Sequence, residues 1–204
     1  MRTLKAAIFG VVLAVAVAPG VAVAGPFEDG LEAYRSQDYA TAFRLLRPLA
    51  EQGHAGAQNN RGIMYMEGRG VPQDYAEALW WYQLAAEQDN SRGQLSLGVM
   101  YNEGRGGPQD YVGALKWFRL AAEQGHARAQ HNLGVMYGKG QGVPQDYVRA
   151  HMWFNLAASR MFPGEDHDRA VEGRDWAAKV MTPDQIAETQ KLAREWRPVG
   201  EQAE

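Results

Sequence analysis

The chain has 204 residues, a formal net charge of −3 and no cysteine. The lack of cysteine excludes disulfides, thiol nucleophiles and thiolate metal sites, so the fold must rely on packing. A mildly acidic chain also lacks the basic footprint of proteins that bind nucleic acid or anionic membranes, and we expect no nucleic-acid partner.

The first 24 residues have the pattern of a secretory signal peptide. Arg2 and Lys5 precede an apolar run over residues 6–18, and Ala22-Val23-Ala24 fits the small-x-small cleavage pattern. We therefore expect cleavage after Ala24 and a periplasmic or secreted protein. The apolar run is short for a membrane span of about 20 residues. No later segment is apolar for long enough, so no integral membrane segment is expected after cleavage.

The segment Gln-Asp-Tyr occurs four times at a constant interval of 36 residues, with its tyrosines at Tyr39, Tyr75, Tyr111 and Tyr147. A fixed period of this length indicates a stack of similar units rather than a compact enzyme core.

Each unit is predicted to be a helix, a glycine-rich loop and a second, antiparallel helix. In the third unit Ala129, Leu133 and Tyr137 share one helical face. The glycines and proline of residues 138–144 end that helix, and Asp146 is placed to cap the next one, whose buried face begins at the motif tyrosine. One hairpin cannot bury its apolar face alone, so the units must stack.

The shared pattern is Ala-x-x-x-Leu-Gly-x-x-Tyr, then Gly-x-Gly-Val-Pro-x-Asp-Tyr, then Ala-x-x-Trp-Phe-x-x-Ala-Ala. It resembles the Sel1-like repeat, a longer-looped relative of the tetratricopeptide repeat, in three copies over residues 55–158. The third copy carries it at Ala129, Leu133, Gly134, Tyr137, Gly140, Gly142, Val143, Pro144, Asp146, Ala150, Trp153, Ala157 and Ala158. Arg61, Gly93 and Gly107 depart from the pattern. Arg61 replaces a leucine and is expected to make the first interface more solvated.

The resemblance implies an exported bacterial protein with an all-α fold: a right-handed α-solenoid of antiparallel helix pairs with capping helices at both ends. The predicted divisions are a signal peptide (1–24), a tetratricopeptide-like capping hairpin (25–54), three Sel1-like repeats (about 55–90, 91–126 and 127–160), C-terminal capping helices (161–198) and a disordered tail (199–204). Thr182, Pro183 and Gln185 mark the start of the last helix, which should run to about Trp196.

No constellation of residues points to catalysis, a cofactor or a metal. His54 and His126 follow the same turn glycine and are expected to cap helices, while the remaining histidines lack the spacing of metal ligands. The glycine loops are interrupted by Pro72 and Pro108 and cannot lead directly into a helix as a phosphate loop does. We therefore expect a protein that is not an enzyme.

A partner is expected on the first helix of each unit, which lines the concave wall in tetratricopeptide-type stacks. The resemblance implies groove positions two before, two after and five after the core leucine. Helical geometry agrees, since residues 131 and 135 lie opposite the core face. The predicted groove contains Asn59, Ile63, Met66, Leu95, Val99, Asn102, His131, Val135 and Lys139. Alternatively, Ile63, Val99 and Val135 only pack against neighbouring helices.

The predicted function is an exported protein–protein interaction scaffold that binds a peptide or protein segment in this groove. The resemblance implies adaptor roles in envelope assembly or signalling. Two alternatives remain open: a cell-wall or β-lactam hydrolase of the Sel1-repeat type, and a carbohydrate-binding module. The latter needs several of Trp80, Tyr82 and Trp176 on the surface.

Overall fold

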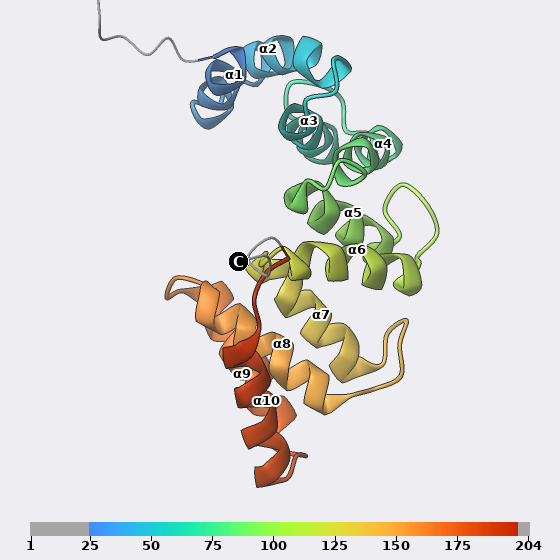
Figure 1. The fold of residues 1–204 in the computed structure, drawn as a ribbon. Coiled ribbons are helices and arrows are strands. Elements are labelled where there is room, and N and C mark those ends of the chain that lie inside the picture. The colour runs from blue at the N-terminus through green and yellow to red at the C-terminus, as the bar shows by residue number, and fades with distance from the viewer. Residues whose placement is uncertain (1–24, 200–204) are drawn as a thin grey trace, which may run out of the picture.

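The structure, a computed structural model, describes residues 25–199, which form ten helices and no strand (Figure 1). No helix within these residues is long and apolar enough to cross a membrane. The helices are α1 (Pro26–Arg35), α2 (Tyr39–Glu51), α3 (Ala55–Glu67), α4 (Tyr75–Ala86), α5 (Ser91–Glu103), α6 (Tyr111–Glu123), α7 (Ala127–Lys139), α8 (Tyr147–Arg160), α9 (Glu165–Ala178) and α10 (Pro183–Glu195).

Consecutive helices pack against each other and build an all-α solenoid. We call α3, α5 and α7 the first helices of their units, and α4, α6 and α8 the second helices. Direct contacts between α3 and α5, and between α7 and α9, show that α9 extends the layer of first helices. Figure 1 shows the stack curving, so that α1 and α9 lie on the same side of the arc.

The aspartate of the repeated motif begins each second helix, as predicted. The side chains of Asp74, Asp110 and Asp146 accept hydrogen bonds from backbone amides in the first turns of α4, α6 and α8, and Asp38 does the same for α2. The predicted burial of the motif tyrosine holds in part. Tyr39, Tyr111 and Tyr147 are partly buried against the core, whereas Tyr75 is 37% exposed and lies at the edge of the next unit's loop.

The second glycine of each loop explains the fixed spacing of the motif. Gly70 has a φ of +76°, and a Cβ there would lie 2.6 Å from the carbonyl oxygen of Tyr39 in the preceding unit. Gly106 makes the same approach to Tyr75. Only glycine allows both the positive φ and this close backbone contact. Each loop therefore rests on the motif of the unit before it.

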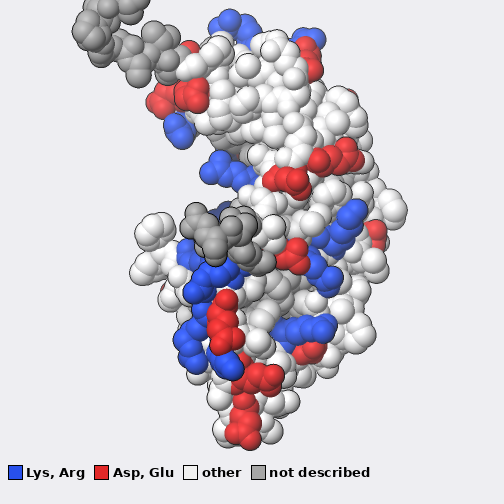
Figure 2. Space-filling model, viewed as in Figure 1, with Lys and Arg blue, Asp and Glu red and all other residues white. Residues whose placement is uncertain are grey.

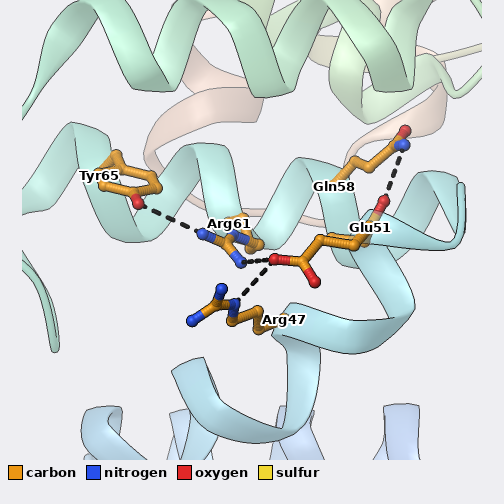
Figure 3. Close-up of polar contacts among 6 residues, drawn as sticks. Arg47, Glu51, Gln58, Arg61 and Tyr65 are labelled. Atoms are coloured by element: carbon orange, nitrogen blue, oxygen red, sulfur yellow. Dashed lines mark hydrogen bonds and ion pairs between the residues drawn. The ribbon is translucent and has the colours of Figure 1, made fainter.

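Arg61 lies in the junction between the first two helix pairs, and the expectation of a more solvated edge was wrong. Its side chain is only 5% exposed. The guanidinium carbon lies 4.5 Å from the ring centre of Phe43 and 4.4 Å from that of Trp81. Figure 3 shows its two polar contacts, a hydrogen bond of 3.2 Å to the Tyr65 hydroxyl and an ion pair of 3.9 Å with Glu51. Aromatic faces take the place of water around this cation.

The C-terminal helices cover the last repeat in two different ways. Helix α9 packs on α7 and α8, whereas α10 packs on α8. Thr189 of α10 is hydrogen-bonded to buried His151 of α8, with 2.8 Å between Oγ1 and Nδ1. Thr182 and Gln185 form the predicted capping box of α10. The residues that α10 exposes are mostly polar or charged, among them Asp184, Glu188 and Lys191.

The chain turns back after α10. Val199, placed by the sequence in a disordered tail, donates its backbone N–H to the Glu123 carbonyl at 2.8 Å. Residues 200–204 and the predicted signal peptide lie outside the described residues.

Candidate protein-binding groove

Eight of the nine predicted groove residues line cavities along the layer formed by α3, α5, α7 and α9. We call them the first-helix groove: Ile63, Met66, Leu95, Val99, Asn102, His131, Val135 and Lys139. Figure 2 shows charged side chains gathered more densely over the C-terminal half of the face in view than over the N-terminal end.

Asn59 does not belong to the groove, and its prediction was wrong. The side chain is only 4% exposed, and it lines none of these cavities. On either side of it in the sequence, Gln58 donates a hydrogen bond to the Ala50 carbonyl and Arg61 contacts α2. Because the Asn59 side chain is almost fully buried, a partner has no access to it.

Three cavities of the groove occupy equivalent places at successive junctions between units. Their volumes are about 270, 220 and 180 Å³, and we call them the first, second and third junction cavities. Each is lined by a branched aliphatic residue, the last residue of a first helix and an aromatic ring of a second helix. These sets are Ile63, Glu67 and Tyr82; Val99, Glu103 and Phe118; and Val135, Lys139 and Phe154.

The equivalence follows from the repeat itself. Within each unit the ring of the second helix lies against the glycine after the core leucine position: a Cβ on Gly98 would be 2.6 Å from the Phe118 ring. The same approach is made by Gly134 to Phe154. This close approach sets the ring at the floor of the groove, where the next helix of the layer, α7 or α9, forms the opposite wall.

Helix α9 forms a wall of the groove that sequence reasoning missed, because its residues were assigned to a cap. A fourth cavity, the largest of the four at about 440 Å³, is lined by Leu95, Val99, Arg128, His131, Asn132, Met161, Asp166 and Arg169. Gly173 and Trp176 of α9 line the third junction cavity. The spacing 166, 169, 173 and 176 is one stripe of a helix, a signal readable from the sequence once α9 is placed beside α7.

The charges of the largest cavity are partly compensated. Arg128 binds Asp166 through two nitrogens, at 2.8 and 2.6 Å from Oδ2. Burial lowers the pKa of His131, so its ring is neutral at neutral pH, and its Nδ1 has no hydrogen-bond partner within the described residues. The cavity thus offers aliphatic, amide and imidazole groups with a charged edge.

His54 and His126 lie at the starts of helices. His54 caps α3 by accepting the Ala57 N–H at 3.1 Å, whereas His126 begins α7 without such a bond. In residues 25–199 no cluster of histidine and acidic residues can hold a metal.

The three aromatic residues proposed for sugar binding come from two helices. Trp80 and Trp176 are exposed, but Tyr82 is buried. Trp80 and Tyr82 lie on α4, whereas Trp176 lies on α9 and contacts Tyr147. Two of the three are thus exposed, on separate helices.

Comparison with known proteins identifies the repeat. Residues 25–54, 55–90, 91–126 and 127–160 match the Sel1 repeat. The N-terminal hairpin is therefore a fourth repeat, which corrects the predicted count of three. Its short link between helices had set it apart in the sequence. No curated protein matches the chain.

Two solved structures are similar to this chain. A Sel1 repeat protein from Oxalobacter formigenes has 30% sequence identity and a TM-score of 0.71, over 84% of this chain and 68% of that one. The protein c5321, a protective antigen of uropathogenic Escherichia coli strains with an SLR fold, has 26% identity and a TM-score of 0.51. That match covers 84% of this chain and 44% of c5321, so the chain spans less than half of its length.

Sel1 repeat proteins are typically non-enzymatic scaffolds that mediate protein interactions. The four matched segments cover most of the described residues, and the helix pairs have the arrangement of the solved Sel1 solenoids. This chain belongs to the Sel1 repeat family.

Proposed function

We propose that this protein is an exported scaffold that binds a segment of another protein along the first-helix groove. The observation that carries the proposal is the row of three equivalent cavities, one at each junction along the layer formed by α3, α5, α7 and α9. A row at the repeat spacing suits a chain-like partner, because successive side chains of one segment can enter successive cavities.

The groove residues have the chemistry of a protein-binding surface. Val99 and Val135 are half-buried against the core and also line the cavities, so packing and binding are compatible roles. Asn102 and the charged ends of the first helices supply polar groups at the rim. Apolar pockets with a polar rim are the usual composition of protein interfaces.

Replacing Val99 and Val135 together by glutamate tests the groove. We expect capture of partners from an envelope extract to fall roughly tenfold or more, because carboxylates would be desolvated in the cavities. Val112→Glu is the matched control, since Val112 lies on the second helix α6 and is 66% exposed. Full capture by a folded double variant, checked by circular dichroism, contradicts the groove assignment.

A photo-crosslinking residue at Asn102 gives a second readout that does not depend on charge. Crosslinks to a partner should form from Asn102, in the second junction cavity, and not from Gln83, an exposed residue of α4. Equal crosslinking from both positions would mean that the partner does not select the groove.

Export is proposed from the pattern of residues 1–24 alone. N-terminal sequencing of the protein recovered from a periplasmic fraction should begin at Gly25. Recovery only from the cytoplasm with an intact N-terminus would contradict export, and it would leave the groove proposal standing.

A further inference from the structure

The last residue of each first helix differs along the groove. The two earlier units end in glutamates that are paired with an arginine two residues later: Glu67 with Arg69 at 3.0 Å and Glu103 with Arg105 at 2.7 Å. In the third unit the equivalent residues are Lys139 and Gln141. A neutral ion pair is thus replaced by one uncompensated cation.

Helix electrostatics explain why Lys139 needs no partner within the fold. A glutamate at a helix C-terminus is repelled by the negative end of the helix dipole, and the nearby arginine offsets this. A lysine at the same place is attracted by the dipole. The ammonium of Lys139 is exposed and has no ion pair or hydrogen bond with any residue in 25–199. It remains available to a ligand.

The arginines of the earlier units are also held by the unit before them. Arg69 lies 5.2 Å from the ring centre of Tyr39, and Arg105 lies 5.9 Å from that of Tyr75. Gln141 cannot make such a cation–π contact with the equivalent tyrosine. The third loop therefore lacks both the glutamate–arginine ion pair and the arginine–tyrosine contact of the two earlier loops.

Lys139 stands at the rim of the third junction cavity, whose other lining residues are apolar or glycine except for His131. Val135, Phe154 and Trp176 surround this space of about 180 Å³, enough for one large apolar side chain. Gly138 makes the site possible, since a Cβ there would lie 2.5 Å from the Trp176 ring. The equivalent Asn102 of the preceding unit could not accept a tryptophan so closely.

We propose that the bound segment places a large apolar side chain in the third junction cavity and an aspartate or glutamate on Lys139. This inference rests on the proposed function and specifies the partner's chemistry. The carboxylate sets the register of the segment, because Lys139 carries the only uncompensated charge among the last residues of α3, α5 and α7. Glu67 and Glu103 already have their cations.

A selection from a phage-displayed library of random dodecapeptides tests this register. The variant is K139E/Q141R, which copies the Glu103–Arg105 pair of the preceding unit and should fold normally. Peptides selected on the unaltered protein should contain an apolar residue beside an acidic one. Their affinity for K139E/Q141R should fall roughly three- to tenfold at low salt, and less at high salt. Lys116→Glu, on the second helix α6, is the matched control and should change nothing.

Two other outcomes separate the inference from the proposed function. Peptides that are lost on the Val99→Glu, Val135→Glu double variant but show no acidic preference, or bind K139E/Q141R equally well, overturn the inference and leave the groove intact. A selection that enriches no peptide over that double variant overturns the proposed function and the inference together.

Discussion

Arg61 and Leu97 occupy the same place in successive units, 36 residues apart, yet one carries a charge and the other a purely apolar side chain. Both are buried, Arg61 to 5% exposure and Leu97 to 0%. Leu133, one unit further on, is also fully buried. One position in the repeat therefore accepts two chemistries.

The difference lies in one neighbour. Trp117 packs in the cluster of Leu97 at the position that Trp81 occupies beside Arg61. The position of Phe43, however, is occupied by Leu79 in the next unit. The Arg61 guanidinium has the Phe43 and Trp81 rings as its two closest aromatic contacts, with the Tyr65 ring further away at 5.6 Å, and these rings take the place of water. With leucine in place of the phenylalanine, the same cation would lose one of its two closest ring contacts. The comparison teaches that the residue at position 61 is coupled to the residue at position 43.

The largest effect is expected from Leu97→Arg. This change buries a charge without the second ring, which costs several kcal/mol out of a total stability of about 5–15 kcal/mol. Urea unfolding followed by circular dichroism would measure the loss. Leu97→Met, which keeps the volume, should cost less than about 1.5 kcal/mol. A Leu97→Arg variant as stable as the unaltered protein would show that a buried charge is tolerated at position 97 without a phenylalanine at position 79.

Arg61→Ala should cost roughly 2–3 kcal/mol in the free energy of unfolding, because it removes the ring contacts and leaves a cavity. Arg61→Leu restores the residue of the other units and should lie within about 1 kcal/mol of the unaltered protein, since the desolvation of the cation disappears as well. A Leu variant as unstable as the Ala variant would mean that the cation itself stabilises the junction.

Adding Leu79→Phe to Leu97→Arg rebuilds the Arg61 arrangement one unit later. The second ring should recover about 1–2 kcal/mol of the lost stability, the size of a desolvated cation–π contact. A double-mutant cycle with Leu79→Phe alone measures this coupling. Additive effects would contradict the proposed link between the two positions.

The smallest effect concerns pH. His126, His131 and His151 of the C-terminal half have pKa values lowered mainly by burial. The three histidines therefore bind a proton less readily in the folded protein than in the unfolded chain. Their stabilising contribution is complete above the unfolded pKa of about 6.5 and is lost as the pH falls below it.

Urea unfolding at neutral and mildly acidic pH should show this loss. His131→Leu, which copies Leu95 of the preceding unit, should reduce the dependence on pH, and Arg61→Leu should not. If the pH dependence of the free energy of unfolding is unchanged in His131→Leu, His131 does not contribute to it.

The sequence predicted the helix pairs, the Asp caps and the capping box at Thr182 because these depend on residues a few positions apart. It also predicted the positions that line the junction cavities, since helical periodicity places them opposite the core face. It could not show that Asn59 is buried, or that Arg61 contacts the rings of Phe43 and Trp81. Those facts depend on contacts between units.

By itself, the sequence determined that this protein is a stack of helical hairpins, because the period, the loop glycines and the Asp caps are local and repeated. The tertiary structure decided where the copies stop being equivalent. It placed α9 as a further wall of the groove and Trp176 against Gly138. Such differences arise where distant segments meet, and spacing along one chain does not encode them.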